Sequence, residues 1–92
     1  MSEKLSQAVM IANRRGLHAR ASARFAKDAG AYAAKVEVCK GGTTVVGTSI
    51  MGLMMLGAAK GDTVEISAIG ADASVALRAL VGLVEGLFGE SE

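Results

Sequence analysis

The sequence predicts an α+β fold in which three helices pack on one face of a four-stranded, largely antiparallel sheet. Two observations support this class. Several short segments alternate apolar and polar residues, which is typical of strands with one buried face. Between and after them lie segments with apolar residues at helical spacing. A chain of 92 residues has room for one compact domain, so we expect a single domain over residues 1–92.

The first two predicted elements are a strand over residues 5–11 and a helix from His18 to about Ala29. Residues 13–16 between them are polar and end in glycine, which is typical of a loop. Gly30 follows the alanine-rich helix as a stop signal. The predicted buried stripe of this helix consists of Ala21, Phe25, Ala26 and Ala29.

The middle of the chain predicts a β-hairpin and a short helix. Two runs rich in β-branched residues, 35–39 and 43–46, are separated by the sequence Lys-Gly-Gly, which is a hairpin signal. Thr48 or Ser49 then offers an N-cap for a helix that reaches about Leu56.

The last third predicts one more strand and a final helix. Residues 62–69 alternate again, with Val64, Ile66 and Ala68 on one face. Asp72 is a candidate N-cap for a helix whose apolar residues recur at helical spacing, namely Leu77, Leu80, Val81, Val84, Leu87 and Phe88. The predicted order is therefore β-α-β-β-α-β-α.

The composition argues against several functional classes. With 51% hydrophobic and 21% charged residues, the chain is typical of a soluble globular protein. Its formal net charge of +1 gives no general attraction to nucleic acid or to an acidic membrane surface. Cysteine and histidine each occur once, so we expect neither a disulfide framework nor a structural zinc site. The sequence shows neither a signal-peptide pattern nor a membrane-spanning run, so we expect a cytoplasmic protein. We also expect a monomer that needs no cofactor and no metal.

The segment from Gly16 to Ser22 carries the predicted chemistry. His18 lies where a loop becomes a helix, so the backbone N–H groups of Ala19, Arg20 and Ala21 lack intrahelical acceptors. With the positive end of the helix dipole, these donors form an anion site beside an imidazole, a side chain that is nucleophilic near neutral pH. The guanidinium of Arg20 can reach the same oxygens. Further positive charge comes from Arg14, Arg15 and Arg24.

A plainer interpretation of the same residues stays open. A lone histidine at a helix start is often a cap or a surface residue, and an arginine cluster is usually a solvated face. Gly16 stands alone, so no glycine-rich nucleotide loop precedes the helix, and no nucleophilic triad is indicated. The residues thus favour a phosphate acceptor that lacks the machinery to bind ATP.

Two motifs resemble those of HPr, the histidine phosphocarrier of the phosphoenolpyruvate-dependent phosphotransferase system. They are Gly16-Leu-His-Ala-Arg20 and Thr48-Ser-Ile-Met-Gly-Leu-Met-Met-Leu-Gly57, and the resemblance runs from about Leu5 to Leu87. It implies an HPr-like open-faced sandwich in which Enzyme I, itself charged from phosphoenolpyruvate, phosphorylates His18 on Nδ1. The resemblance also implies that the group passes to an EIIA-type protein, and that Arg20 assists the phosphate.

One position departs from the family pattern. Most sugar-type members have proline directly after that arginine, whereas this chain has Ala21. Proline fixes φ in the first helical turn without losing a hydrogen bond, so alanine leaves the turn less rigid but adds a possible donor. With Arg14 and Arg15 just before the site, this form looks more like the nitrogen-type regulatory branch than the sugar-transport branch.

The second motif predicts a helix with two different faces. Leu53 and Leu56 form a pair that can face the core. Methionine is flexible and polarizable, which suits a surface that accepts several partners. We therefore expect partner docking by Arg24 and by a second face that carries Ile50, Met51 and Met54. Alternatively, these three residues and the two leucines can all be core.

Ser49 has two interpretations. As the residue before a short helix, it is an N-cap. The resemblance implies a second role, because this serine matches the position that HPr kinase/phosphorylase modifies in many bacteria.

Three functional hypotheses remain open from the sequence. They are a phosphoryl carrier without turnover of its own, a regulatory binding module whose phosphorylation state controls docking, and a small-ligand-binding α+β domain. The last is disfavoured because the polar groups converge on an exposed helix end and not in a concave pocket. Only the first requires transfer from His18 to an acceptor.

Overall fold

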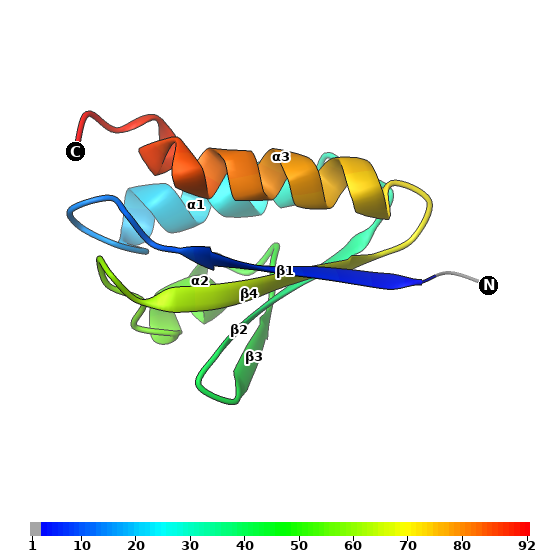
Figure 1. The fold of residues 1–92 in the computed structure, drawn as a ribbon, viewed down its shortest axis with the longest axis horizontal. Coiled ribbons are helices and arrows are strands. Elements are labelled where there is room, and N and C mark those ends of the chain that lie inside the picture. The colour runs from blue at the N-terminus through cyan, green and yellow to red at the C-terminus, as the bar shows by residue number, and fades with distance from the viewer. Residues whose placement is uncertain (1–2) are drawn as a thin grey trace.

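A computed structural model describes residues 3–92, with elements in the order β-α-β-β-α-β-α (Figure 1). The strands are β1 (Lys4–Met10), β2 (Lys35–Lys40), β3 (Thr43–Val46) and β4 (Thr63–Ile69). The helices are α1 (Ala19–Ala29), α2 (Ile50–Met55) and α3 (Ala73–Glu85), followed by a short 3₁₀ helix, η1 (Leu87–Gly89). The predicted fold class is confirmed.

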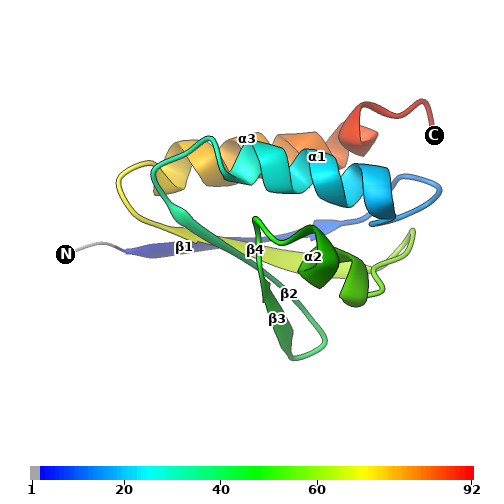
Figure 2. The ribbon, with the colours of Figure 1, turned by 180° about the vertical axis from the view of Figure 1, so that it is seen from behind.

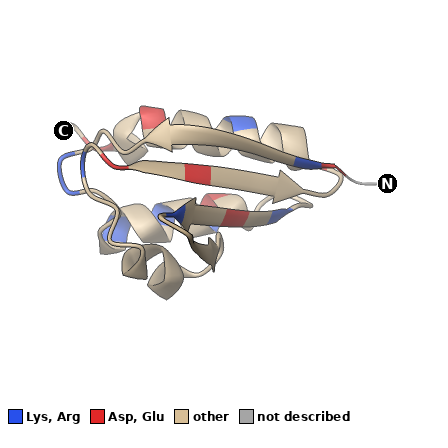
Figure 3. Cartoon of the chain, turned by 60° about the horizontal axis from the view of Figure 1, so that its bottom comes forward, with Lys and Arg blue, Asp and Glu red and all other residues tan. Residues whose placement is uncertain are grey.

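The sheet positions the helices above a single core. Its strand order is β1-β4-β2-β3, and every neighbouring pair is antiparallel. Helices α1 and α3 run side by side over the sheet, and α2 contacts α1 (Figure 2). The opposite face of the sheet is left open, as seen in Figure 3. Side chains that are at most 2% exposed fill the core from every helix and from the inner strands, among them Phe25, Val38, Leu53, Ile66 and Leu80.

Local signals in the sequence explain most of the element boundaries. The turn between β2 and β3 consists of Gly41 and Gly42, with φ values of +56° and +86° that suit the tight hairpin turn. Ser49 takes the N-cap position of α2, and its Oγ accepts a hydrogen bond from the N–H of Gly52 at 2.9 Å. Helix α1 buries the four residues of its predicted stripe together with Ser22, whose hydroxyl donates to the carbonyl of Leu17 at 3.1 Å.

The end of the chain differs from the prediction. Asp72 precedes α3 as expected, but its side chain does not cap the helix, because Oδ2 accepts a hydrogen bond from the N–H of Ala33 at 2.7 Å. The predicted continuation of the helix through Leu87 and Phe88 is wrong. These residues have φ values of +61° and +55°, so the α-helix ends at Glu85 and a short 3₁₀ helix with left-handed backbone follows. Phe88 reaches the core nevertheless, being 4% exposed.

None of the helices within residues 3–92 combines the length and the apolar character needed to cross a bilayer.

Candidate functional site

His18 is the N-cap residue of α1, and the loop before it is shaped by Gly16. Gly16 has a φ of +65°, and a Cβ there would lie 2.9 Å from Cα of Ala59 and clash with the carbonyl oxygen of Ala58. The N–H of Leu17 donates to that same carbonyl at 2.9 Å. The loop is therefore held against the segment after α2. This arrangement places the His18 ring at the start of the helix, where Nδ1 accepts a long hydrogen bond of 3.3 Å from the N–H of Arg20.

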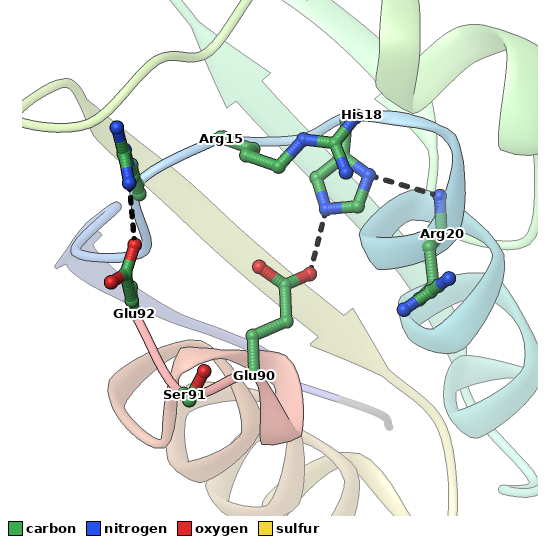
Figure 4. A pocket seen from close by; sticks show the side chains of 7 residues that line it. Arg15, His18, Arg20, Glu90, Ser91 and Glu92 are labelled. Atoms are coloured by element: carbon green, nitrogen blue, oxygen red, sulfur yellow. Dashed lines mark hydrogen bonds and ion pairs between the residues drawn. The ribbon is translucent and has the colours of Figure 1, made fainter.

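The second ring nitrogen of His18 faces the C-terminal end of the chain (Figure 4). Its Nε2 lies 2.6 Å from Oε2 of Glu90, and each of the two side chains is 17% exposed. The other carboxylate oxygen of Glu90 accepts a hydrogen bond of 3.1 Å from Nδ2 of Asn13. Asn13 is fully buried, and its Nδ2 also donates to the carbonyl of Gly16 at 2.8 Å. The ring is thus held from both of its nitrogens.

The surroundings of Glu90 keep its side chain ionised at neutral pH. Partial burial raises the pKa of this carboxyl group. Hydrogen bonds from His18 and Asn13, followed by the charges of His18 and Arg15, outweigh that effect and hold the pKa below its ordinary value of 4.5. A carboxylate therefore faces Nε2 under physiological conditions.

An open depression of about 430 Å³ surrounds the ring (Figure 4). Three of the four predicted arginines line it together with His18, and its full lining is Arg14, Arg15, His18, Arg20, Glu90, Ser91 and Glu92. Arg14 is paired with Glu92 at 2.8 Å, and the exposed side chains of Arg15 and Arg20 complete the positive rim. Arg24 lies one turn further along α1 and pairs with Asp28 at 3.4 Å, so it is not part of the depression.

The arrangement suits an anion. Exposed guanidinium groups and the backbone donors of a helix start surround a histidine nitrogen, and such donors bind phosphate oxygens. Nowhere in the described residues do three side chains of the metal-binding types come close enough together to hold an ion.

Comparison with known proteins agrees with this geometry. The family model described as "PTS HPr component phosphorylation site" matches residues 5–86. The chain belongs to the HPr family. HPr of Neisseria meningitidis serogroup A is 50% identical over 88 residues, which cover 96% of this chain and 99% of that protein. The phosphocarrier protein NPr of Shewanella violacea is 36% identical over 88 residues, which cover 96% of this chain and 97% of NPr.

Solved HPr structures share the fold. The crystal structure of HPr-C-His from Thermoanaerobacter tengcongensis superposes with a TM-score of 0.91 at 40% sequence identity, covering 96% of this chain and 99% of that chain. HPr from Bacillus anthracis superposes with a TM-score of 0.85 at 36% identity, covering 88% of this chain and 96% of that one. The similarity therefore extends over the whole sheet and its helices.

The second predicted motif of this HPr-family chain forms a helix with one buried and one exposed side. Leu53 is 0% exposed and Leu56 is 7% exposed, as the predicted spacing requires. The opposite side carries apolar residues that are 41–79% exposed, and we call it the methionine patch: Ile50, Met51, Met54 and Met55. Met55 was not expected there. The alternative in which all of the predicted apolar side chains belong to the core is excluded by these exposures.

Two residues of the HPr-family site were missed by the sequence reasoning, namely Asn13 and Glu90. Asn13 was assigned only to a polar loop, and Glu90 lies beyond the last predicted element. An asparagine three residues before a glycine is only a weak signal that its side chain will hydrogen-bond within the loop, as Nδ2 of Asn13 does to the carbonyl of Gly16. Glu90 gave no local signal, because its contact with His18 spans 72 positions of the sequence.

Proposed function

We propose that the protein is a phosphocarrier of the phosphotransferase system, in which His18 accepts a phosphoryl group from phospho-Enzyme I and donates it to an EIIA-type protein. The observation that carries this proposal is the position of Nδ1, which lies at the start of α1 beside the depression lined by Arg15 and Arg20. The HPr family membership supports the same role. A carrier of this kind is consumed and regenerated by its partners and has no turnover of its own.

The transfer step follows from the groups around the ring. The lone pair of Nδ1 attacks phosphorus, the bond between phosphorus and the donor atom breaks, and its electron pair returns to the donor. The N–H of Arg20 donates a long hydrogen bond of 3.3 Å to Nδ1, and it can donate to a phosphoryl oxygen instead. The N–H groups of Ala19 and Ala21, which also lack intrahelical acceptors, can join it. The guanidinium groups of Arg15 and Arg20 offset the charge on the transferred oxygens.

Docking of the protein partners is assigned in this proposal to the methionine patch and to Arg24 on α1. The exposed side chains of the patch lie on α2, which contacts α1 and so lies near the helix that presents His18. Flexible, apolar side chains of this kind can adapt to Enzyme I and to EIIA-type proteins in turn.

Ser49 is proposed as a second phosphorylation site, modified by HPr kinase/phosphorylase. Its side chain is partly exposed, and it directly precedes Ile50 of the methionine patch. A phosphate on Ser49 would place about −1.5 to −2 charges beside an apolar docking surface, and desolvation of that charge opposes docking. The modification would therefore slow transfer to His18.

The experiment that tests the carrier role is transfer from the phosphorylated protein to a panel of sugar-type and nitrogen-type EIIA domains. We expect transfer to at least one domain, and the type of domain that is served identifies the sugar-transport or the nitrogen-regulatory branch. A protein that is phosphorylated on His18 but transfers to no member of the panel would contradict the carrier role. It would favour a regulatory binding module instead.

A further inference from the structure

A chain of three polar side chains leads from the core to the phosphate-accepting ring. Fully buried Asn13 donates to Glu90 at 3.1 Å, and Glu90 lies 2.6 Å from Nε2 of His18. These residues come from three different parts of the chain, namely the loop after β1, the segment after η1 and the start of α1. Glu90 therefore contacts the ring nitrogen that does not take part in the proposed transfer.

We infer that Glu90 is a positioning residue, which holds the His18 ring with its proton on Nε2 and its lone pair on Nδ1. The inference deepens the proposed function and rests on it. A neutral imidazole carries one N–H and one acceptor nitrogen. A carboxylate facing Nε2 requires the N–H there, and the N–H of Arg20 facing Nδ1 requires the acceptor there. Both contacts select the same tautomer.

The opposite tautomer meets two repulsive contacts. A proton on Nδ1 would face the N–H of Arg20, and the lone pair of Nε2 would face the carboxylate of Glu90. The selected tautomer is also the one that proposed transfer needs, since only an unprotonated Nδ1 can attack phosphorus.

Glu90 also stabilises the positive charge that transfer creates on the ring. When Nδ1 bonds to phosphorus, the proton on Nε2 stays in place and the ring becomes cationic. The carboxylate then lies beside that new positive charge, which is the role that a buried aspartate has for the catalytic histidine of serine proteases. Both carboxylate oxygens of Glu90 are engaged, because Asn13 donates to one and Nε2 of His18 contacts the other.

The charged groups around the pair do not compete for Glu90. Arg15 lies close enough to lower the pKa of the carboxyl group, but the structure records no ion pair between them among residues 3–92. Arg14 is engaged by the neighbouring acidic residue Glu92 at 2.8 Å. The carboxylate of Glu90 is thus committed to the ring.

The test is nitrogen NMR of the His18 ring in the full-length, unphosphorylated protein, which needs no partner. We expect the wild type to show one tautomer and a directly observable Nε2–H proton, because the hydrogen bond slows exchange with water. Glu90→Ala should lose that proton signal and show both tautomers. Glu85→Ala, which removes a carboxylate from the exposed end of α3, is the matched control and should behave as the wild type.

The kinetic part of the test is the rate at which phospho-Enzyme I phosphorylates His18 in the same proteins. Glu90→Ala should slow this step about tenfold, the order expected for loss of one charge-assisted hydrogen bond. Glu90→Gln keeps the size of the side chain and removes its charge, so it should slow the step as well. Wild-type ring signals and wild-type rates in both variants would overturn the inference.

Failure of the proposed function would look different. In that case the wild type itself would stay unphosphorylated, while the NMR difference between wild type and Glu90→Ala would persist.

Discussion

Oε2 of Glu90 lies 2.6 Å from Nε2 of His18, although 72 positions separate the two residues in the sequence. The contact ties the last residues of the chain to the start of α1. Glu90 also accepts a hydrogen bond from the buried side chain of Asn13, so the C-terminal segment contributes to the site.

This contact predicts a pH-dependent contribution to stability. In the folded protein the hydrogen bonds and charges around Glu90 outweigh its partial burial and hold its pKa below 4.5. A lowered folded-state pKa means that the contribution is fully present above the ordinary value and is lost as the pH falls through the folded value. We expect Glu90→Gln to melt below the wild type at about pH 6, with the difference shrinking as the pH is lowered below the ordinary pKa of 4.5. Thermal unfolding across this range checks it, and a constant difference would contradict it.

Opposite sides of α2 predict opposite effects of substitution. Leu53→Ala should lower the free energy of unfolding by about 2–5 kcal/mol, because this side chain is fully buried. Met51→Glu should change it by only about 0.5 kcal/mol, because Met51 is 70% exposed, while weakening binding to Enzyme I. Urea unfolding and a binding titration measure the two effects. A Met51→Glu protein that is strongly destabilised but still binds would remove the docking assignment.

The loop before His18 predicts a costly substitution at Gly16. Gly16→Ala must accommodate a Cβ at a φ of +65°, next to the backbone of Ala58 and Ala59. We expect a loss of about 2–3 kcal/mol in the free energy of unfolding and slower phosphorylation of His18. The control is Gly41→Ala, where φ is +56° and no atom lies within 4 Å of the new Cβ. It should cost only about 1–2 kcal/mol, with no change in phosphorylation, and equal effects at both sites would refute the role of the close approach.

Ser49 predicts a separation between stability and transfer. Ser49→Asp should slow phosphorylation of His18 with little change in melting temperature, because the added charge lies beside the methionine patch and a short acid can still cap α2. Ser49→Ala should instead lower stability by about 1 kcal/mol, since the bond to the N–H of Gly52 is lost, while phosphorylation of His18 continues. Comparing rates of His18 phosphorylation in these two variants and the wild type is the check. Equal rates in all three would leave Ser49 as a helix cap.

The sheet and the first two helices were predictable because their signals are local. Alternation placed Val64, Ile66 and Ala68 on one buried face of β4, and helical spacing separated buried Leu53 from exposed Met51. Each of these assignments depends on residues within a few positions of one another. The fold class followed from the order of such segments.

The end of α3 and half of the site were not predictable in this way. Apolar spacing continues through Leu87 and Phe88, but these residues have positive φ values and lie outside α3, although Phe88 is still buried. Periodicity detects which side chains are apolar and not which path the backbone takes. Glu90 follows this change of backbone conformation and meets a residue 72 positions away, so no pattern around either residue predicts the contact.

The proposed function requires that His18 is the phosphoryl acceptor. The most direct measurement is the intact mass of the protein after incubation with Enzyme I and phosphoenolpyruvate, for the wild type and for His18→Ala. We expect the wild type to gain one phosphoryl group in an acid-labile, alkali-stable bond, as a phosphorylated imidazole nitrogen requires, and His18→Ala to gain none. Arg20→Ala should gain the group more slowly with its fold intact. A phosphoryl group added by Enzyme I to the His18→Ala protein would show that His18 is not the acceptor.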